Sequence, residues 1–353
     1  MFSGSYKKDD VEFLLKTIDI DFTSVETKEK LIQNNKKHYS EMLSPEYEPS
    51  EEYLKVFYQI FEINKKRFAK DILNLAYNLS LKKEIVLVSL VRAGTPIGVL
   101  LKRTLKQKFN KEIKHYSISI IRDREIDENA IKHILKFHPN SEFIFVDGWT
   151  GKGVINRELK KFIKKFNQKN GTNISDNLYV VSDIAFVSDF AVTNEDYLIP
   201  SSALNSTISG LVSRSILNEM ICKNDFHGCK YYKEFEKNDL SLWFVEEIMK
   251  LIKNLEIDKT PLITKNSNKN INISTFLQNI QKEYKIEDIN FIKPGIGETT
   301  RVLLRRVPYL IFVKDKNSIY IQHLLQLSKE KNVKVIEDKT LPYTALAIIK
   351  KVV

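Results

Sequence analysis

The sequence contains only two cysteines, Cys222 and Cys229, among 353 residues. Two cysteines cannot build a disulfide framework, and they cannot form a four-ligand zinc cluster without help from histidines. So few cysteines are typical of a protein from a reducing compartment. We therefore expect neither a disulfide-stabilised fold nor a structural zinc site.

Long apolar runs are missing as well. No stretch approaches the roughly 18 uninterrupted apolar residues that a membrane span requires. The first residues, MFSGSYKKDDVEFLLK, also lack the basic-then-apolar pattern of a secretory signal. The sequence thus predicts a cytoplasmic protein without a membrane partner.

Hydrophobic residues make up 42% of the chain and aromatic residues 10%, which is the composition of a folded protein. The length predicts two or three domains. The formal net charge is +11, and residues 260–353 hold 16 Lys and Arg against 8 Asp and Glu. A basic C-terminal part is typical of a polyanion-binding segment, but a lysine-rich proteome produces the same excess, so both explanations stay open.

Apolar periodicity divides the chain into four parts. We predict a helical lead-in over 1–80, an α/β domain over 81–258, a linker over 259–272 that is rich in Asn, Lys, Thr and Ser, and a second α/β domain over 273–353. In the lead-in, helices are expected at 11–18, 28–43 and 51–79.

The second part alternates short apolar runs with helical patterns. Strands are expected at 84–90, 115–121, 142–146 and 178–184, and helices at 97–105, 128–137, 154–166 and 241–255, with a further helix ending near Met220. This order predicts a mostly parallel sheet whose ligands bind beyond the carboxyl ends of the strands. In the last part we expect strands at 289–292, 309–313 and 333–336, and helices at 274–284, 298–306, 319–331 and 342–350.

A glycine turn follows the strand at 142–146. Its residues Thr150, Gly151, Lys152 and Gly153 stand directly before a predicted helix, where backbone N–H groups and the helix dipole favour a bound phosphate. Asp147, at the end of the strand, is then placed to receive ribose hydroxyls or a metal ion. The segment does not match the nucleotide-binding P-loop, and an ordinary strand-to-helix loop is the plain alternative.

A second turn of this kind follows the strand at 84–90. Here Arg92, Gly94 and Thr95 suit a pyrophosphate, so two phosphate-type turns suggest a ligand with phosphates at both ends. The charged loop after the strand at 115–121 supplies a third group. We take Arg122 as a phosphate ligand and Asp123 as a catalytic candidate.

These turns resemble the ribose-phosphate and pyrophosphate loops of type I phosphoribosyltransferases, although Gly148 stands where that family has a second acid. More closely, the chain resembles the bacterial StiP family, also described as tellurium-resistance-associated phosphoribosyltransferases. That resemblance covers about residues 1–255. It rests on five segments: HYSEML at 38–43, LVRAGTP at 90–96, IIRD at 120–123, VDGWTGKG at 146–153 and EDYLIPSS at 195–202.

The resemblance implies a type I phosphoribosyltransferase-like fold and transfer of a phosphoribosyl group from phosphoribosyl diphosphate to a base, in a stress-associated pathway for a nucleoside-like product. Asp147, Arg92 and Asp123 would be catalytic, and Mg²⁺, held in part by Asp147, would be the cofactor. The missing second acid keeps an alternative open, in which the protein binds nucleotide and RNA without turnover.

The StiP family also carries the name of a cysteine protease. Cys229 lies two residues after His227, and Lys230 is a candidate for lowering the pKa of its thiol. Against this second alternative, catalytic Cys and His normally come from distant positions.

The last part contains PGIGETTR at 294–301, which opens a helix and is followed by Arg305 and Arg306. It resembles the Pelota and archaeal kink-turn-binding ribosomal-protein fold, with Gly297 in place of that family's asparagine. The resemblance implies RNA binding through residues 273–353, with Glu298, Arg301, Arg305 and Arg306 as contacts. Positive charge and hydrogen-bond donors suffice for contacts to phosphates, and a basic helix face packed on its own domain is the alternative.

Overall fold

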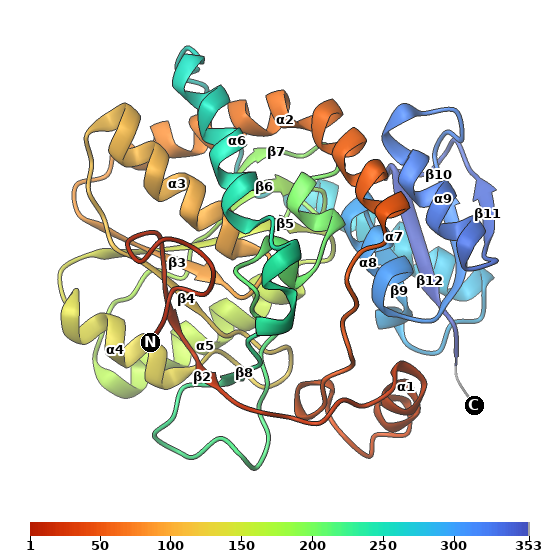
Figure 1. Ribbon diagram of the computed structural model, residues 1–353, viewed down its shortest axis with the longest axis horizontal. Coiled ribbons are helices and arrows are strands. Elements are labelled where there is room, and N and C mark those ends of the chain that lie inside the picture. The colour runs from red at the N-terminus through yellow and green to blue at the C-terminus, as the bar shows by residue number, and fades with distance from the viewer. Residues whose placement is uncertain (352–353) are drawn as a thin grey trace.

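The computed structural model describes residues 1–351, and Figure 1 shows two sheets with helices packed against both. The larger sheet belongs to the main unit, residues 1–255. It has six strands in the order β1-β4-β3-β5-β6-β7, and every neighbouring pair is parallel. The strands are β1 (Glu12–Leu14), β3 (Ile85–Leu90), β4 (His115–Ile118), β5 (Glu142–Thr150), β6 (Leu178–Asp183) and β7 (Phe190–Thr193).

Helices cover both faces of this sheet, as parallel sheets require. One face packs against α2 (Glu51–Ser80), α3 (Gly94–Phe109) and α6 (Ser241–Asn254), which also contact one another. The other face packs against α4 (Glu128–Phe137) and α5 (Val154–Asn170). The result is two apolar cores, one on each side of the sheet.

Residues 267–351 form the C-terminal unit. Its sheet has the order β11-β10-β12-β9, in which β10 and β11 are parallel and the other pairs antiparallel. The elements are α7 (Ser267–Glu283), β9 (Ile292–Pro294), α8 (Ile296–Arg305), β10 (Pro308–Val313), α9 (Gln322–Glu330), β11 (Lys334–Glu337) and β12 (Ala345–Ile349). In Figure 1 this unit lies beside one end of the main sheet.

Two predicted helices were wrong. The segment 11–18 forms β1 and then β2 (Lys16–Thr17), which pairs with β8 (Gly228–Cys229). The segment 342–350 contains β12, whose five residues are all buried and which pairs with β10 and β9. In both cases a pairing partner far away in the sequence outweighs a helical pattern.

Two other helix predictions changed. The helix expected at 28–43 is a shorter α1 (Val25–Gln33) followed by a 3₁₀ turn, and the segment leading to Met220 has 3₁₀ turns and irregular structure instead of an α-helix. By contrast, α4 has the bounds that the sequence predicts, and α2 differs by one residue.

The mixed α/β class and the mostly parallel central sheet are confirmed. The four-part division of the chain stays a prediction. Among residues 1–351, no helix combines the length and apolar character needed to cross a bilayer.

Candidate functional site

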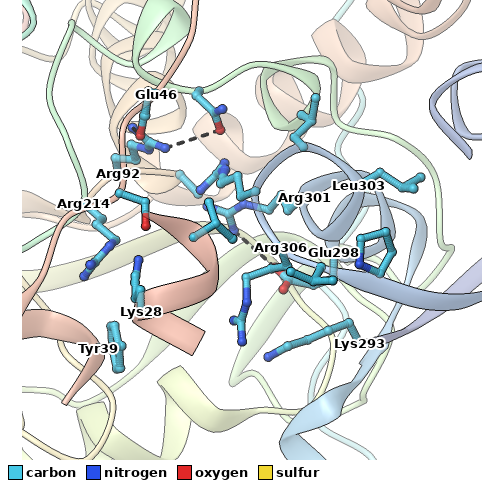
Figure 2. Close-up of a pocket in the computed structure, with 18 of the residues that line it drawn as sticks. Lys28, Tyr39, Glu46, Arg92, Arg214, Lys293, Glu298, Arg301, Leu303 and Arg306 are labelled. Atoms are coloured by element: carbon cyan, nitrogen blue, oxygen red, sulfur yellow. Dashed lines mark hydrogen bonds and ion pairs between the residues drawn. The ribbon is translucent and has the colours of Figure 1, made fainter. Parts of the chain in front are cut away.

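A cavity of about 1280 Å³ lies between the two units. Its floor is the carboxyl edge of the main sheet, with residues that follow β3, β4 and β5, and α8 of the C-terminal unit forms another wall. Ligands of open parallel sheets bind at this edge. Figure 2 shows cationic side chains from both units facing this space.

Most of the predicted site residues line this one cavity. These are Arg92, Arg122, Asp147, Thr150, Gly151, Lys152, Gly153, Glu298, Arg301, Arg305 and Arg306. Three others do not line it. Thr95 is hydrogen-bonded to Ser117 inside the sheet (2.7 Å). A Cβ on Gly94 would lie 2.5 Å from the carbonyl oxygen of Val146, so this glycine allows close packing on β5. Asp123 is exposed and pairs with Arg122 (3.0 Å).

The loop before α5 is a tight turn between β5 and the helix. The N–H of Gly153 donates to Thr150 Oγ1 (3.0 Å), and Gly153 has a φ of 69° in the left-handed region that suits glycine. Lys152 Nζ donates to the carbonyl of Ile289 in the C-terminal unit (2.9 Å). The loop therefore joins the two units as well as lining the cavity.

Arg92 lines the cavity and has partners on its guanidinium group. Its guanidinium pairs with Glu46 at 2.7 Å and donates to the carbonyl of Val212 at 3.2 Å, and both charged side chains are almost fully buried. Asp147 accepts a hydrogen bond from the N–H of Gly148 (2.8 Å). Burial raises the pKa of Asp147 to about 7, against the opposing effect of Arg301.

The predicted RNA-binding residues face the main unit. Arg301 pairs with Glu298 (3.2 Å) and stacks 5.2 Å from the ring centre of Trp149. Arg306 pairs with the buried Glu29 of α1 at 2.6 Å. Arg305 Nε is buried without a hydrogen-bond partner among the described residues.

The N-terminus of α8, which the resemblance marks for RNA, is occupied from across the interface. Asp196 of the main unit accepts hydrogen bonds from the N–H groups of Ile296 (2.9 Å) and Thr344 (2.7 Å). A carboxylate at this position uses the helix dipole that a phosphate would use. This end of α8 is therefore an interdomain contact.

The cavity also contains cations that sequence reasoning missed, among them Lys28, Arg214 and Lys293. Arg214 lies 5.4 Å from the ring centre of Tyr39 and donates to the carbonyl of Met42. Lys28 comes from α1 and Lys293 from β9. None of the three stands in a local motif, so only the folded chain identifies them.

The two cysteines lie away from the cavity. Cys229 is buried on β8, and burial raises the pKa of its thiol to about 12. Lys230 does not activate it as predicted, because its ammonium group lies 3.5 Å from Asp19 and over the ring of Phe22. Cys222 is exposed, and its backbone N–H donates to Asp225 (2.9 Å), which also pairs with Lys16.

Both the side chain and the backbone of His227 are hydrogen-bonded. Its Nδ1 is hydrogen-bonded to Ser119 Oγ (2.7 Å), and its backbone N–H donates to Asp127 (2.5 Å). Burial lowers the pKa of its imidazole, and Asp127 opposes that shift. A neutral imidazole is the form that can accept a proton.

The described residues do not form a set of ligands for Mg²⁺. Within residues 1–351, no group of three or more His, Cys, Asp or Glu side chains is arranged to hold a metal ion. Asp147 is one carboxylate beside Arg301, and Mg²⁺ requires several oxygen ligands. The residues present do not fit a resident Mg²⁺.

Comparison with known proteins gives two matching family models. One, described as "Tellurite-like stress resistance cysteine protease StiP", matches residues 4–249, and the other, "PELOTA RNA binding domain", matches residues 272–351. A curated protein of Acinetobacter baylyi named "Cysteine protease StiP" is 38% identical over 366 residues, which cover 99% of this chain and 94% of that protein.

These comparisons overturn the main prediction of activity. The expected phosphoribosyl transfer, and the classification of the protein as a glycosyltransferase, were wrong, because both the family model and the full-length relative carry the name of a cysteine protease. Glycine turns at the edge of a parallel sheet do not by themselves specify a reaction.

Proposed function

Because the chain belongs to the StiP family, we propose that it is a cysteine protease that acts in a tellurite-like stress response. The observation that carries this proposal is the 38% identity to a named cysteine protease over nearly the whole length of both chains. We also propose that the main sheet has the form of a type I phosphoribosyltransferase and that the protein is cytoplasmic. Neither proposal implies a particular reaction.

We assign the nucleophile to Cys229 and the general base to His227. His227 directly precedes the two-residue strand β8, and its carbonyl and that of Cys229 both accept hydrogen bonds from the segment 16–18. Side chains two residues apart in extended backbone point to the same face, a spacing that is compatible with a Cys–His pair. In the reaction, the thiol proton passes to the imidazole and sulfur attacks the peptide carbonyl. The amine then leaves with that proton, and water hydrolyses the thioester. Burial of the thiol requires that β8 open before a substrate can reach it.

The test uses the full chain with denatured casein as the substrate, and new peptide termini are counted by mass spectrometry. We expect Cys229→Ser and His227→Ala to lose cleavage by at least 10²-fold, while Cys222→Ser cleaves like the wild type. Equal peptide release by the wild type and a Cys222→Ser/Cys229→Ser double variant would refute the protease function. Loss only in Cys222→Ser would overturn the choice of nucleophile.

We propose RNA as a partner of the C-terminal unit, supported by the match to a Pelota RNA-binding model. Phosphate contacts make such binding weaker as salt rises. RNA affinity that is unchanged between 50 and 200 mM salt, or that survives removal of residues 270–353, would defeat this proposal.

A further inference from the structure

The interdomain cavity is lined by more cationic than carboxylate side chains, and several of these cations are half-buried in it. Four of its cations have acidic partners, in the pairs Arg92–Glu46, Arg122–Asp123, Arg301–Glu298 and Arg306–Glu29. Among the described residues, Lys28, Arg214, Lys293 and Arg305 have no carboxylate within 4 Å. Even partial burial of unpaired cations costs free energy unless a counter-ion joins them.

The unpaired cations lie close enough to repel one another. Burial lowers the pKa of Lys28 to about 6, with Arg214 and Arg306 adding to the shift. Burial likewise lowers the pKa of Lys293 to about 8. In Figure 2, Lys28 and Arg214 lie on one side of the cavity, and Arg306 and Lys293 lie on the other. A multiply charged anion between them would relieve this repulsion.

From the arrangement of these side chains, we propose that the cavity binds a small molecule with two or more phosphoryl groups, held between the main and C-terminal units. Arg305, Lys28 and Arg214 would hold one phosphoryl group, and Arg306 and Lys293 another. This inference goes beyond the proposed proteolysis and does not depend on it.

Phosphate fits better than a carboxylate for two reasons. Arginine forks and lysine point charges together match its several oxygens. The first turn of α5 also borders the cavity with no side-chain cap and no acidic residue, so free N–H groups of this 17-residue helix are available there.

The size of the cavity and its position between the units favour a small ligand over RNA. A volume of about 1280 Å³ is somewhat larger than a usual small-molecule site, which spans about 300 to 1,000 Å³. Arg301 and Arg306 point into this space between the units, and Asp196 caps the start of α8. The start of α8 is thus already occupied by a carboxylate, which favours a small ligand inside the cavity over RNA at this helix end.

The experiment is calorimetric titration of the full-length protein with pyrophosphate, ADP and phosphoribosyl diphosphate, with sulfate and a 12-nucleotide RNA as comparison ligands. We expect at least one of the three diphosphates to bind more tightly than sulfate. We also expect Lys28→Gln and Arg305→Gln to raise its Kd at least tenfold. The exposed lysines Lys36 and Lys316 lie outside the cavity, so Lys36→Gln and Lys316→Gln should bind like the wild type.

Three results would overturn the proposal. The first is that none of the diphosphates binds more tightly than sulfate. The second is that both cavity variants keep the wild-type affinity. The third is that RNA is the only ligand whose binding those variants weaken. Thermal unfolding verifies that each variant is folded, and Arg305→Lys, which keeps the charge, should recover part of the affinity. Cys229→Ser should bind like the wild type, so loss of proteolysis and loss of binding are distinguishable.

Discussion

At the scale of single residues, burial decides how each cysteine reacts. Cys222 is exposed, whereas the pKa of the buried Cys229 thiol is raised to about 12. Thiolates are the reactive form, so we expect iodoacetamide at pH 8 to modify Cys222 at least tenfold faster than Cys229 in the folded protein. Peptide mass spectrometry over a time course measures both rates, and in urea they should become similar. Faster labelling of Cys229 would show that β8 is open at rest.

Asp147 makes the free energy of unfolding depend on pH, and the sign of that dependence follows from its pKa. Its folded pKa of about 7 lies above the unfolded value of about 4. Between these values the folded state binds more protons, so this group costs stability as pH rises from 4 to 7, and the full cost persists above 7. Relative to the wild type, Asp147→Asn should gain about 1 to 3 kcal/mol of unfolding free energy between pH 5 and pH 8. Urea denaturation at the two pH values checks this, and an equal difference at both would contradict it.

At the scale of elements, the sequence predicted local signals well and long-range pairing poorly. The start of α2 is a local signal, because Ser50 Oγ accepts a hydrogen bond from the N–H of Tyr53 (3.2 Å). The strands β1 and β12 depend on partners about a hundred and about forty residues away, respectively, and both were predicted as helices. A strand's partner cannot be read from its own few residues.

The cap at Ser50 can be tested by substitution. Ser50→Ala should destabilise the protein by about 1 kcal/mol, because it leaves an N–H group of the first turn without its acceptor. Ser50→Asp, which keeps an acceptor, should retain most of that stability. Thermal unfolding of the three proteins decides the matter, and equal Tm values for the alanine and aspartate variants would rule out the cap.

At the scale of the whole molecule, the candidate site could be predicted only in part. The glycine turn at Thr150–Gly153 and the arginines of α8 were found separately, from local patterns. Their meeting in one cavity depends on how the two units pack, which no local pattern encodes. Lys28, from α1, and Arg214, from an irregular segment, also line this cavity. Most of its unpaired cations therefore could not be predicted before the fold was known.

Asp196 should control how firmly the two units are joined. Its carboxylate accepts hydrogen bonds from Ile296 and Thr344 in the C-terminal unit, and a buried N–H group without an acceptor costs about 1 to 3 kcal/mol. We expect Asp196→Ala to speed amide hydrogen exchange at Ile296 and Thr344 by at least tenfold, while the centre of β5 stays protected. Asp258→Ala, in the exposed segment between the units, is the matched control and should leave exchange unchanged. Unchanged protection in Asp196→Ala would mean that Lys152 and the Gly151–Pro294 packing hold the units together without this carboxylate.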